Sequence, residues 1–189
     1  MAGRERLIPG RRKPARRVPE RLARCVGGRD DPGMEDAPFV PVDFVIPRSL
    51  EMPLFRLEPL GPQHYDADYA AWTSSLEHIR RTPGYPDGRW PDDRNLADNL
   101  RDLRRHAEDF EHRRGFTYTV LGPVTGDVIG CVYIYPEAGT PHHAHVQSWV
   151  RASHAELDVP LWRAVSDWLH AVWPFEGLTY DARPSASET

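Results

Sequence analysis

The sequence predicts an α+β domain built on a mixed, mostly antiparallel sheet that is flanked by helices. Residues 116–151 contain three apolar segments of strand length, separated by turn residues. Residues 93–114 and 158–172 each repeat apolar side chains every three or four positions, as amphipathic helices do. A last strand-length segment, 177–183, follows the second of these helices, and a helix between two strands makes them parallel neighbours.

The three central segments are the clearest strands. They are rich in β-branched and aromatic residues and are bounded by Gly or Pro. They span Phe116–Leu121, Asp127–Pro136 and His145–Arg151. Because residues 122–126 contain two Gly and one Pro, the chain reverses there, and we expect consecutive antiparallel strands. Cys131 lies inside the second strand, where a buried, inert thiol is the ordinary expectation.

The N-terminal half of the domain is predicted to supply one strand and three helices. Residues 54–60 alternate apolar and charged side chains, which is typical of a half-buried strand. Pro62 opens a first helix, residues 74–81 form a second, and residues 93–114 form the longest. The apolar stripe of the longest helix consists of Leu96, Leu100, Leu103, Ala107 and Phe110. Its start is expected to be capped by Asp92 or Asp93.

A change in charge divides the chain near residues 30–34. Residues 1–30 hold 10 of the 24 basic residues and 3 of the 28 acidic ones, a net of +7, so the remainder carries −11. We therefore predict a disordered basic tail at 1–34, a Pro-rich extended segment at 35–53, the domain at 54–183 and a polar tail at 184–189. The basic tail is either an arm for anionic partners or a plain extension, with Met34 as the true start. Nucleic acid is the less favoured partner, because the tail lacks aromatic residues and the body is acidic.

Several classes of protein are excluded by composition. No apolar segment approaches the roughly 20 residues that span a bilayer, and the basic N-terminus lacks the apolar part of a secretory signal. The two cysteines, Cys25 and Cys131, lie in different contexts and indicate no disulfide framework, so we expect a cytoplasmic protein. The sequence contains no nucleophile elbow, phosphate-binding P-loop or dinucleotide fingerprint.

Histidines and tyrosines near the central strands are the candidate chemical groups. His142, His143 and His145 form an HHxH cluster beside Glu137, but no fourth ligand has a recognisable spacing, so we predict no metal site. An exposed loop with chance histidines is the simpler interpretation, and a general base is the alternative. Tyr133 shares a strand face with Tyr135, where the two rings either pack or line an acceptor cleft.

The order of elements, together with three motifs, resembles the GNAT (GCN5-related N-acetyltransferase) superfamily. The motifs are FRLEPLGPQH at the first strand–helix junction, FTYTVLGPVTGDVIGCVYIYP in the hairpin and QSWVR in the following strand. The resemblance covers roughly residues 54–183 and implies an acyl-CoA-dependent N-acyltransferase with acetyl-CoA as co-substrate. The acceptor would be an amine of a small molecule or of a protein N-terminus, and a homodimer is compatible with the resemblance.

The resemblance also implies where the co-substrate and the acceptor bind. Pantetheine would lie along the last central strand, and the diphosphate at the N-terminus of the following helix, where free N–H groups favour anions. The implied cofactor-binding residues are Ser148, Trp149, Val150, Arg151, Asp158 and Leu161. The implied catalytic residues are Glu137, His145 and Tyr133, with His145 or Glu137 taking the proton of the amine.

The expected phosphate loop departs from the family pattern. Glycines normally let the backbone approach the diphosphate there, but residues 153–160 contain none. Glu156 and Asp158 stand about where glycines would be, and their carboxylates would repel a diphosphate, while Pro160 removes one N–H donor. A degenerate GNAT-fold binding module without CoA chemistry is therefore the alternative function.

Overall fold

The computed structural model describes residues 39–85, 90, 95–140 and 142–184 of the chain. The chain divides into two compact units, residues 1–36 and 37–189, and every described residue belongs to the second. The predicted basic tail, Cys25, Met34 and the predicted helix caps Asp92 and Asp93 lie outside the described residues. The described fold is therefore that of the second unit alone.

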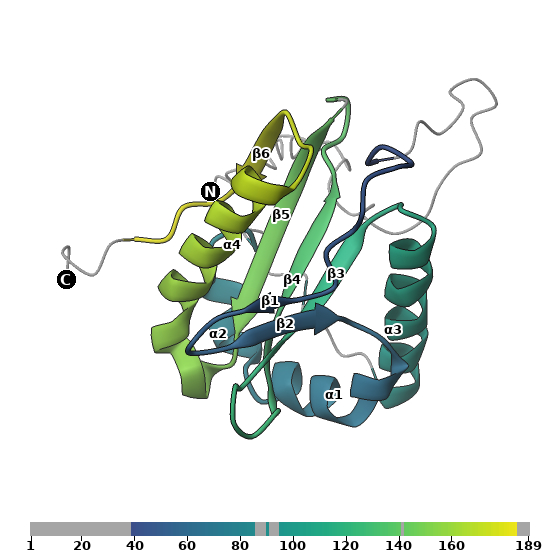
Figure 1. Ribbon diagram of the computed structural model, residues 1–189. Coiled ribbons are helices and arrows are strands. Elements are labelled where there is room, and N and C mark those ends of the chain that lie inside the picture. The colour runs from purple at the N-terminus through teal and green to yellow at the C-terminus, as the bar shows by residue number, and fades with distance from the viewer. Residues whose placement is uncertain (1–38, 86–89, 91–94, 141, 185–189) are drawn as a thin grey trace, which may run out of the picture. The chain divides into compact units, whose positions relative to one another are not determined.

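One mixed sheet forms the centre of this unit (Figure 1). In the described part of the chain its six strands lie in sequence order, β1-β2-β3-β4-β5-β6. Their bounds are Leu50–Glu51, Arg56–Pro59, Phe116–Leu121, Val128–Pro136, His143–Val150 and Gly177–Tyr180. All neighbours are antiparallel except β5 and β6, which are parallel. The predicted α+β class, the three antiparallel central strands and the parallel last pair are confirmed.

Four helices flank the sheet among the described residues. They are α1 Tyr65–Thr73, α2 Leu76–Arg81, α3 Leu96–Glu111 and α4 Asp158–Val172, with 3-10 turns η1 Pro62–His64 and η2 Ala152–Leu157. α3 starts at Leu96, three residues after the predicted start, because Asn95 caps it: the Asn95 Oδ1 accepts from the Asp98 N–H at 3.0 Å. α3 ends earlier than predicted as well, at Glu111, and Arg113 follows with a left-handed φ of 57°.

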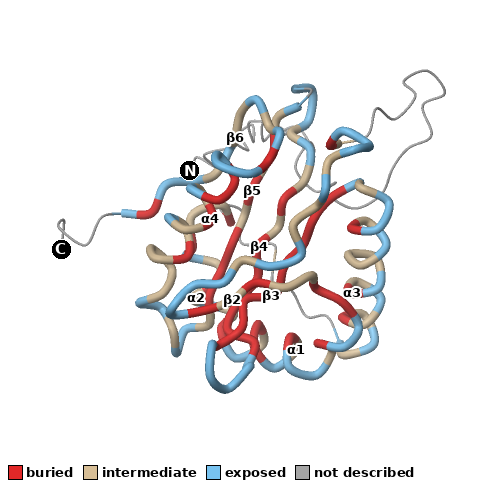
Figure 2. Tube along the Cα trace, in the orientation of Figure 1, coloured by how far each residue is buried: buried red, intermediate tan, exposed pale blue. Residues whose placement is uncertain are grey.

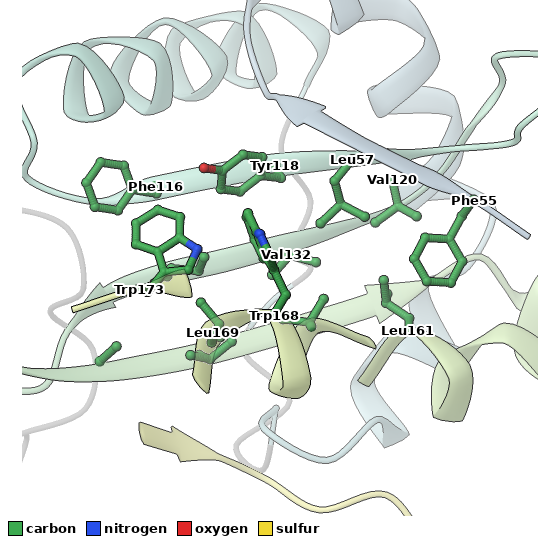
Figure 3. Close-up of a cluster of buried hydrophobic side chains, with 14 of the residues drawn as sticks. Phe55, Leu57, Phe116, Tyr118, Val120, Val132, Leu161, Trp168, Leu169 and Trp173 are labelled. Atoms are coloured by element: carbon green, nitrogen blue, oxygen red, sulfur yellow. The ribbon is translucent and has the colours of Figure 1, made fainter. Parts of the chain in front are cut away.

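The larger core lies between the sheet and α4 (Figure 3). Val132 and Ile134 of β4 are fully buried and point toward this side, as the alternation of their strand predicts. From α4, Leu161, Val165 and Leu169 cover them, in the spacing expected for one helix face. Tyr118 meets Trp168 and Trp173 edge-on, at ring-centroid distances of 5.3 and 6.4 Å.

A second core lies between the opposite face of the sheet and helices α1 and α3. Trp72 of α1, Leu103 of α3 and Cys131 of β4 are buried together, and Trp149 of β5 joins them. The central strands are consequently buried on both faces, which Figure 2 shows as continuous buried stretches of the tube. Tyr133 of β4 packs against this second core.

Candidate functional site at the β5–β6 opening

The parallel pair β5–β6 separates half-way along β5. The strands are paired from His143 with Gly177 to Val146 with Tyr180, whereas β5 continues to Val150. The chain beyond β6 leaves the sheet, so the edge of β5 from Gln147 onward has no sheet partner on that side among the described residues. The resemblance to acetyltransferases implies that the pantetheine arm of the co-substrate would lie in this opening.

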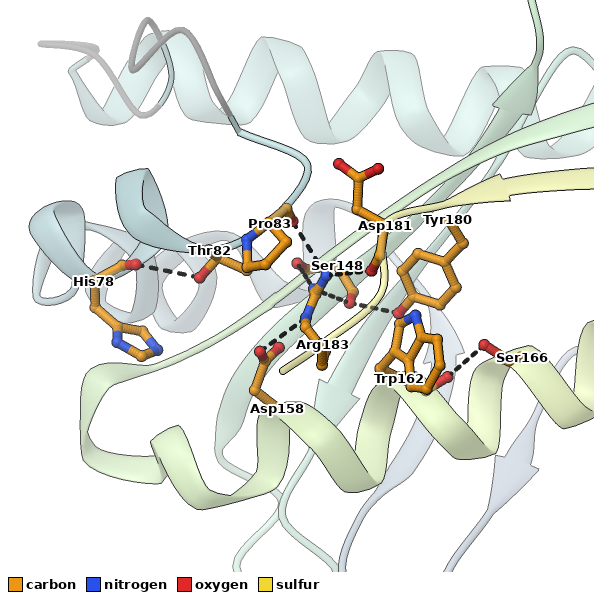
Figure 4. A network of polar contacts seen from close by, with 10 residues as sticks. All are labelled: His78, Thr82, Pro83, Ser148, Asp158, Trp162, Ser166, Tyr180, Asp181 and Arg183. Atoms are coloured by element: carbon orange, nitrogen blue, oxygen red, sulfur yellow. Dashed lines mark hydrogen bonds and ion pairs between the residues drawn. The ribbon is translucent and has the colours of Figure 1, made fainter. Parts of the chain in front are cut away.

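The side chain of Arg183 fills the opening (Figure 4). It is completely buried, and its Nε donates to the Asp158 Oδ2 of α4 at 2.8 Å. Its Nη2 donates to the backbone oxygen of Ser148 at 2.9 Å and to the Ser148 Oγ at 3.1 Å. Its Nη1 donates to the backbone oxygens of Pro83 at 3.1 Å and Asp181 at 2.9 Å. The guanidinium therefore joins β5, α4 and the chain after α2.

This arrangement satisfies the whole guanidinium. A guanidinium with its Nε carries five N–H donors in a fixed plane, and five acceptors surround Arg183. The charge is balanced by Asp158, whose side chain is 18% exposed. Breaking such a buried pair by removing one partner costs about 3–5 kcal/mol, because the other charge is left uncompensated. The Asp158 Oδ1 is buried without a hydrogen-bond partner among the described groups.

Tyr180 closes the side of the opening next to β6. Its hydroxyl lies 2.6 Å from the Ser148 Oγ, and its ring lies 5.7 Å from the Arg183 guanidinium carbon. Burial raises the pKa of Tyr180 to about 12, although the hydrogen bond with Ser148 lowers it in part. Tyr180 is therefore a neutral phenol at physiological pH and adds no charge to the opening.

The chain between β5 and α4 is not arranged to receive a diphosphate. Its N–H groups at Ala152, His154 and Asp158 already donate to the Ser75 Oγ, the Arg151 oxygen and the Ala155 oxygen. The segment is a 3-10 turn without glycine, and the first carboxylate of α4 already binds Arg183. Acetyl-CoA, which the resemblance implies, does not fit these residues: the Asp158 carboxylate lies at the helix N-terminus where the diphosphate would bind, and the pantetheine arm would overlap Arg183.

The structure places the six predicted cofactor residues in different surroundings. Ser148 and Asp158 meet around Arg183 at the opening. Val150 and Leu161 face the larger core and are buried. Trp149 faces the second core, where its Nε1 donates to the Tyr133 hydroxyl at 3.3 Å. Arg151 extends to the α1–α2 turn, where its Nη2 donates to the Ser74 Oγ at 3.2 Å.

Two of the three predicted catalytic residues contact each other. The His145 Nδ1 lies 3.3 Å from the Glu137 Oε2, and both side chains are partly exposed, at 39% and 29%. Tyr133 packs 5.6 Å from the His106 ring and 6.2 Å from the Trp90 ring, and burial raises its pKa well above the usual value. The described part of the chain contains no cluster of three metal-binding side chains.

A buried polar chain crosses the second core, and no sequence pattern indicated it. The Trp149 indole donates to the Tyr133 hydroxyl, and the Cys131 Sγ lies 3.7 Å from the Asp68 Oδ1. The other carboxylate oxygen of Asp68 accepts from the Asn99 Nδ2 at 3.0 Å. Burial, only partly offset by these hydrogen bonds, raises the pKa of Asp68 to about 6. Burial likewise raises the pKa of the Cys131 thiol, which is therefore inert.

The structural resemblance to solved proteins agrees with the geometry of the sheet. The ribosomal-protein-S5-alanine acetyltransferase from Vibrio fischeri matches with a TM-score of 0.50 and 18% identity, over 64% of this chain and 66% of that one. A putative ribosomal-protein-serine acetyltransferase from Vibrio cholerae matches with a TM-score of 0.51 and 11% identity, over 64% and 65%. An acetyltransferase from Salmonella typhimurium that modifies the N-terminal serine of ribosomal protein L7/L12 matches with a TM-score of 0.51 and 7% identity, over 65% of this chain and 68% of that one.

These matches define the fold. The described unit has the fold of the GNAT acetyltransferases, and the match spans about two thirds, 65–66%, of the two Vibrio proteins. No family model matches the sequence, and no curated protein matches it either. Among the described helices, none has the length and apolar character needed to cross a bilayer.

Proposed function

We propose that this protein is a binding module on the GNAT fold and does not use acetyl-CoA through the β5–β6 opening. The observation that carries the proposal is the position of Arg183, whose guanidinium occupies the place implied for pantetheine and is fully bonded there. A cytoplasmic location remains a prediction, which rests on the two cysteines because they indicate no disulfide framework.

Electrostatics at the opening support the same conclusion. If Arg183 moved away, the opening would present the Asp158 carboxylate and the backbone oxygens of Ser148 and Pro83, which are all hydrogen-bond acceptors. An acceptor-rich, negatively charged site repels a diphosphate and attracts a cation. Removal of Arg183 alone would therefore not create a CoA site.

Calorimetric titration with acetyl-CoA and with free CoA tests the proposal. We expect no binding of either molecule up to about 1 mM, a concentration that corresponds to roughly −4 kcal/mol of binding free energy. The same result is expected for Arg183→Ala, because Asp158 and the bonded N–H groups of η2 remain. Micromolar binding by the unmodified protein would overturn the proposal. Binding by Arg183→Ala alone would also overturn it, because the opening would then be a CoA site that Arg183 closes.

An N-acetyltransferase acting on an amine of a small molecule or a protein N-terminus is the second candidate. The observation that favours it is the partly exposed pair His145–Glu137, in which the carboxylate would orient the imidazole. In that function His145 would take the proton of the acceptor amine, and Tyr133 would line the acceptor side. The titration with acetyl-CoA and free CoA decides between the two candidates.

A further inference from the structure

The surroundings of Arg183 match the chemistry of one functional group. Five acceptors face five N–H donors, and each of the three guanidinium nitrogens has its own set of partners. An ammonium group has only three donors and lacks the planar geometry, so it would leave acceptors unsatisfied. The acceptors are therefore arranged for a guanidinium.

Most of this arrangement does not depend on the segment that carries Arg183. Asp158 belongs to α4, Ser148 to β5, and Pro83 follows α2. The Asp181 oxygen is the one acceptor of the five that would leave together with Arg183. Four acceptors, including the carboxylate, would thus remain in place for a guanidinium from another molecule.

The segment after β6 is attached mainly through this one side chain. Asp181, Ala182 and Pro184 are exposed, whereas Arg183 is 6% exposed. Within the described residues, the N–H groups of Ala182 and Arg183 donate no backbone hydrogen bond. The backbone of this segment therefore adds little to its attachment, and its release is opposed mainly by the contacts of the Arg183 side chain, which an incoming guanidinium would replace.

We propose that the opening between β5 and β6 is a guanidinium-binding site, whose ligand is an arginine side chain of a partner polypeptide that takes the place of Arg183. This inference rests on the proposed function and names the ligand of the binding module. The tethered Arg183 competes at an effective concentration in the millimolar range, so the partner must add contacts of its own beyond the guanidinium. That requirement favours a polypeptide over free arginine.

Chemical rescue of the full-length Arg183→Ala variant tests the site. The probe is ethylguanidinium at up to about 20 mM, and the matched control is ethylammonium at equal ionic strength. Ethylguanidinium is expected to raise the melting temperature of the variant by roughly 3 °C at tenfold excess over its dissociation constant. Ethylammonium should have less than a third of that effect, and the unmodified protein, whose site holds Arg183, should not respond.

A second substitution assigns the response to this site. Asp158→Asn combined with Arg183→Ala should abolish the rescue, because the neutral amide no longer balances the cation. Equal rescue by both probes, or rescue that persists in the double variant, would overturn the proposal. If Arg183→Ala does not fold by itself, its refolding is measured in the presence of each probe, and only ethylguanidinium should restore the folded protein; equal yields with the two probes would overturn the proposal.

Peptides distinguish the source of the guanidinium. The peptide acetyl-Ala-Arg-Pro-amide repeats the sequence around Arg183 and should bind Arg183→Ala at least tenfold more tightly than acetyl-Ala-Lys-Pro-amide. It should also bind more tightly than free L-arginine, and equal affinities would overturn the assignment to a polypeptide. Failure of the two proposals is distinguishable, because acetyl-CoA binding contradicts the proposed function, whereas absence of guanidinium selectivity contradicts this inference alone.

Discussion

Asp68 is a buried carboxyl group whose ionisation is coupled to folding. It is 4% exposed on α1, and its two oxygens meet Asn99 and Cys131. Burial raises its pKa from 3.8 to about 6, while the positive field of His64 lowers it and the negative field of Asp102 raises it further. The raised pKa means that the folded protein holds this proton more tightly than the unfolded chain does.

The contribution of Asp68 to the stability of the protein should therefore fall between about pH 4 and pH 6. Below pH 3.8 the carboxyl is protonated in both states, and between 3.8 and about 6 the unfolded chain ionises first. Above about pH 6 the carboxyl is ionised in both the folded and the unfolded state, and the ionisation of Asp68 lowers the free energy of unfolding by roughly 3 kcal/mol. Asp68→Asn should remove this part of the pH dependence in urea unfolding measured from about pH 4 to pH 7.5. The exposed Asp66→Asn on the same helix is the control, and an unchanged profile for Asp68→Asn would contradict the assignment.

At the scale of elements, the sequence predicted the strands better than the site. β3, β4 and β5 were recognisable because each combines β-branched residues with Gly or Pro boundaries, and these signals are local. The predicted start of α3 was early because several consecutive polar residues can cap a helix, and Asn95 caps it in the structure. Arg183 could not be assigned, because its partners lie 25, 35 and 100 positions away. No periodicity in the sequence records such contacts.

β4 lies between β3 and β5 in the sheet, and a substitution at Val132 tests how much the fold depends on it. Val132 is fully buried between β3 and β5, where it pairs with Tyr118 and Ser148. Val132→Asp would place an unpaired carboxylate in the larger core, which costs several kcal/mol of the roughly 5–15 kcal/mol that hold a domain together. We expect this variant not to accumulate as a folded protein. Val124→Asp, at a turn residue that is 94% exposed, is the matched control and should unfold like the original protein.

At the scale of the whole molecule, the segment before the first strand is part of the core. Phe39 stacks on Phe116 and Phe175 at 5.8 and 4.9 Å, and Val40 is 1% exposed. The Tyr118 hydroxyl donates to the Pro47 oxygen at 2.5 Å, and this hydrogen bond holds the segment before β1 against β3. The Pro-rich segment predicted as extended thus contributes side chains to the larger core, starting at Phe39.

These contacts separate two truncations that the sequence alone would not distinguish. A chain that begins at Met34 keeps Phe39, Val40 and Pro47, and we expect its melting temperature to lie within about 2 °C of the full chain. A chain that begins at Leu50 loses these groups and the aromatic stacking on Phe116, so its melting temperature should fall by several times that amount. Thermal unfolding followed by circular dichroism gives both values. A large loss on removal of residues 1–33 would mean that the basic segment binds the body of the protein and stabilises it, contrary to its composition.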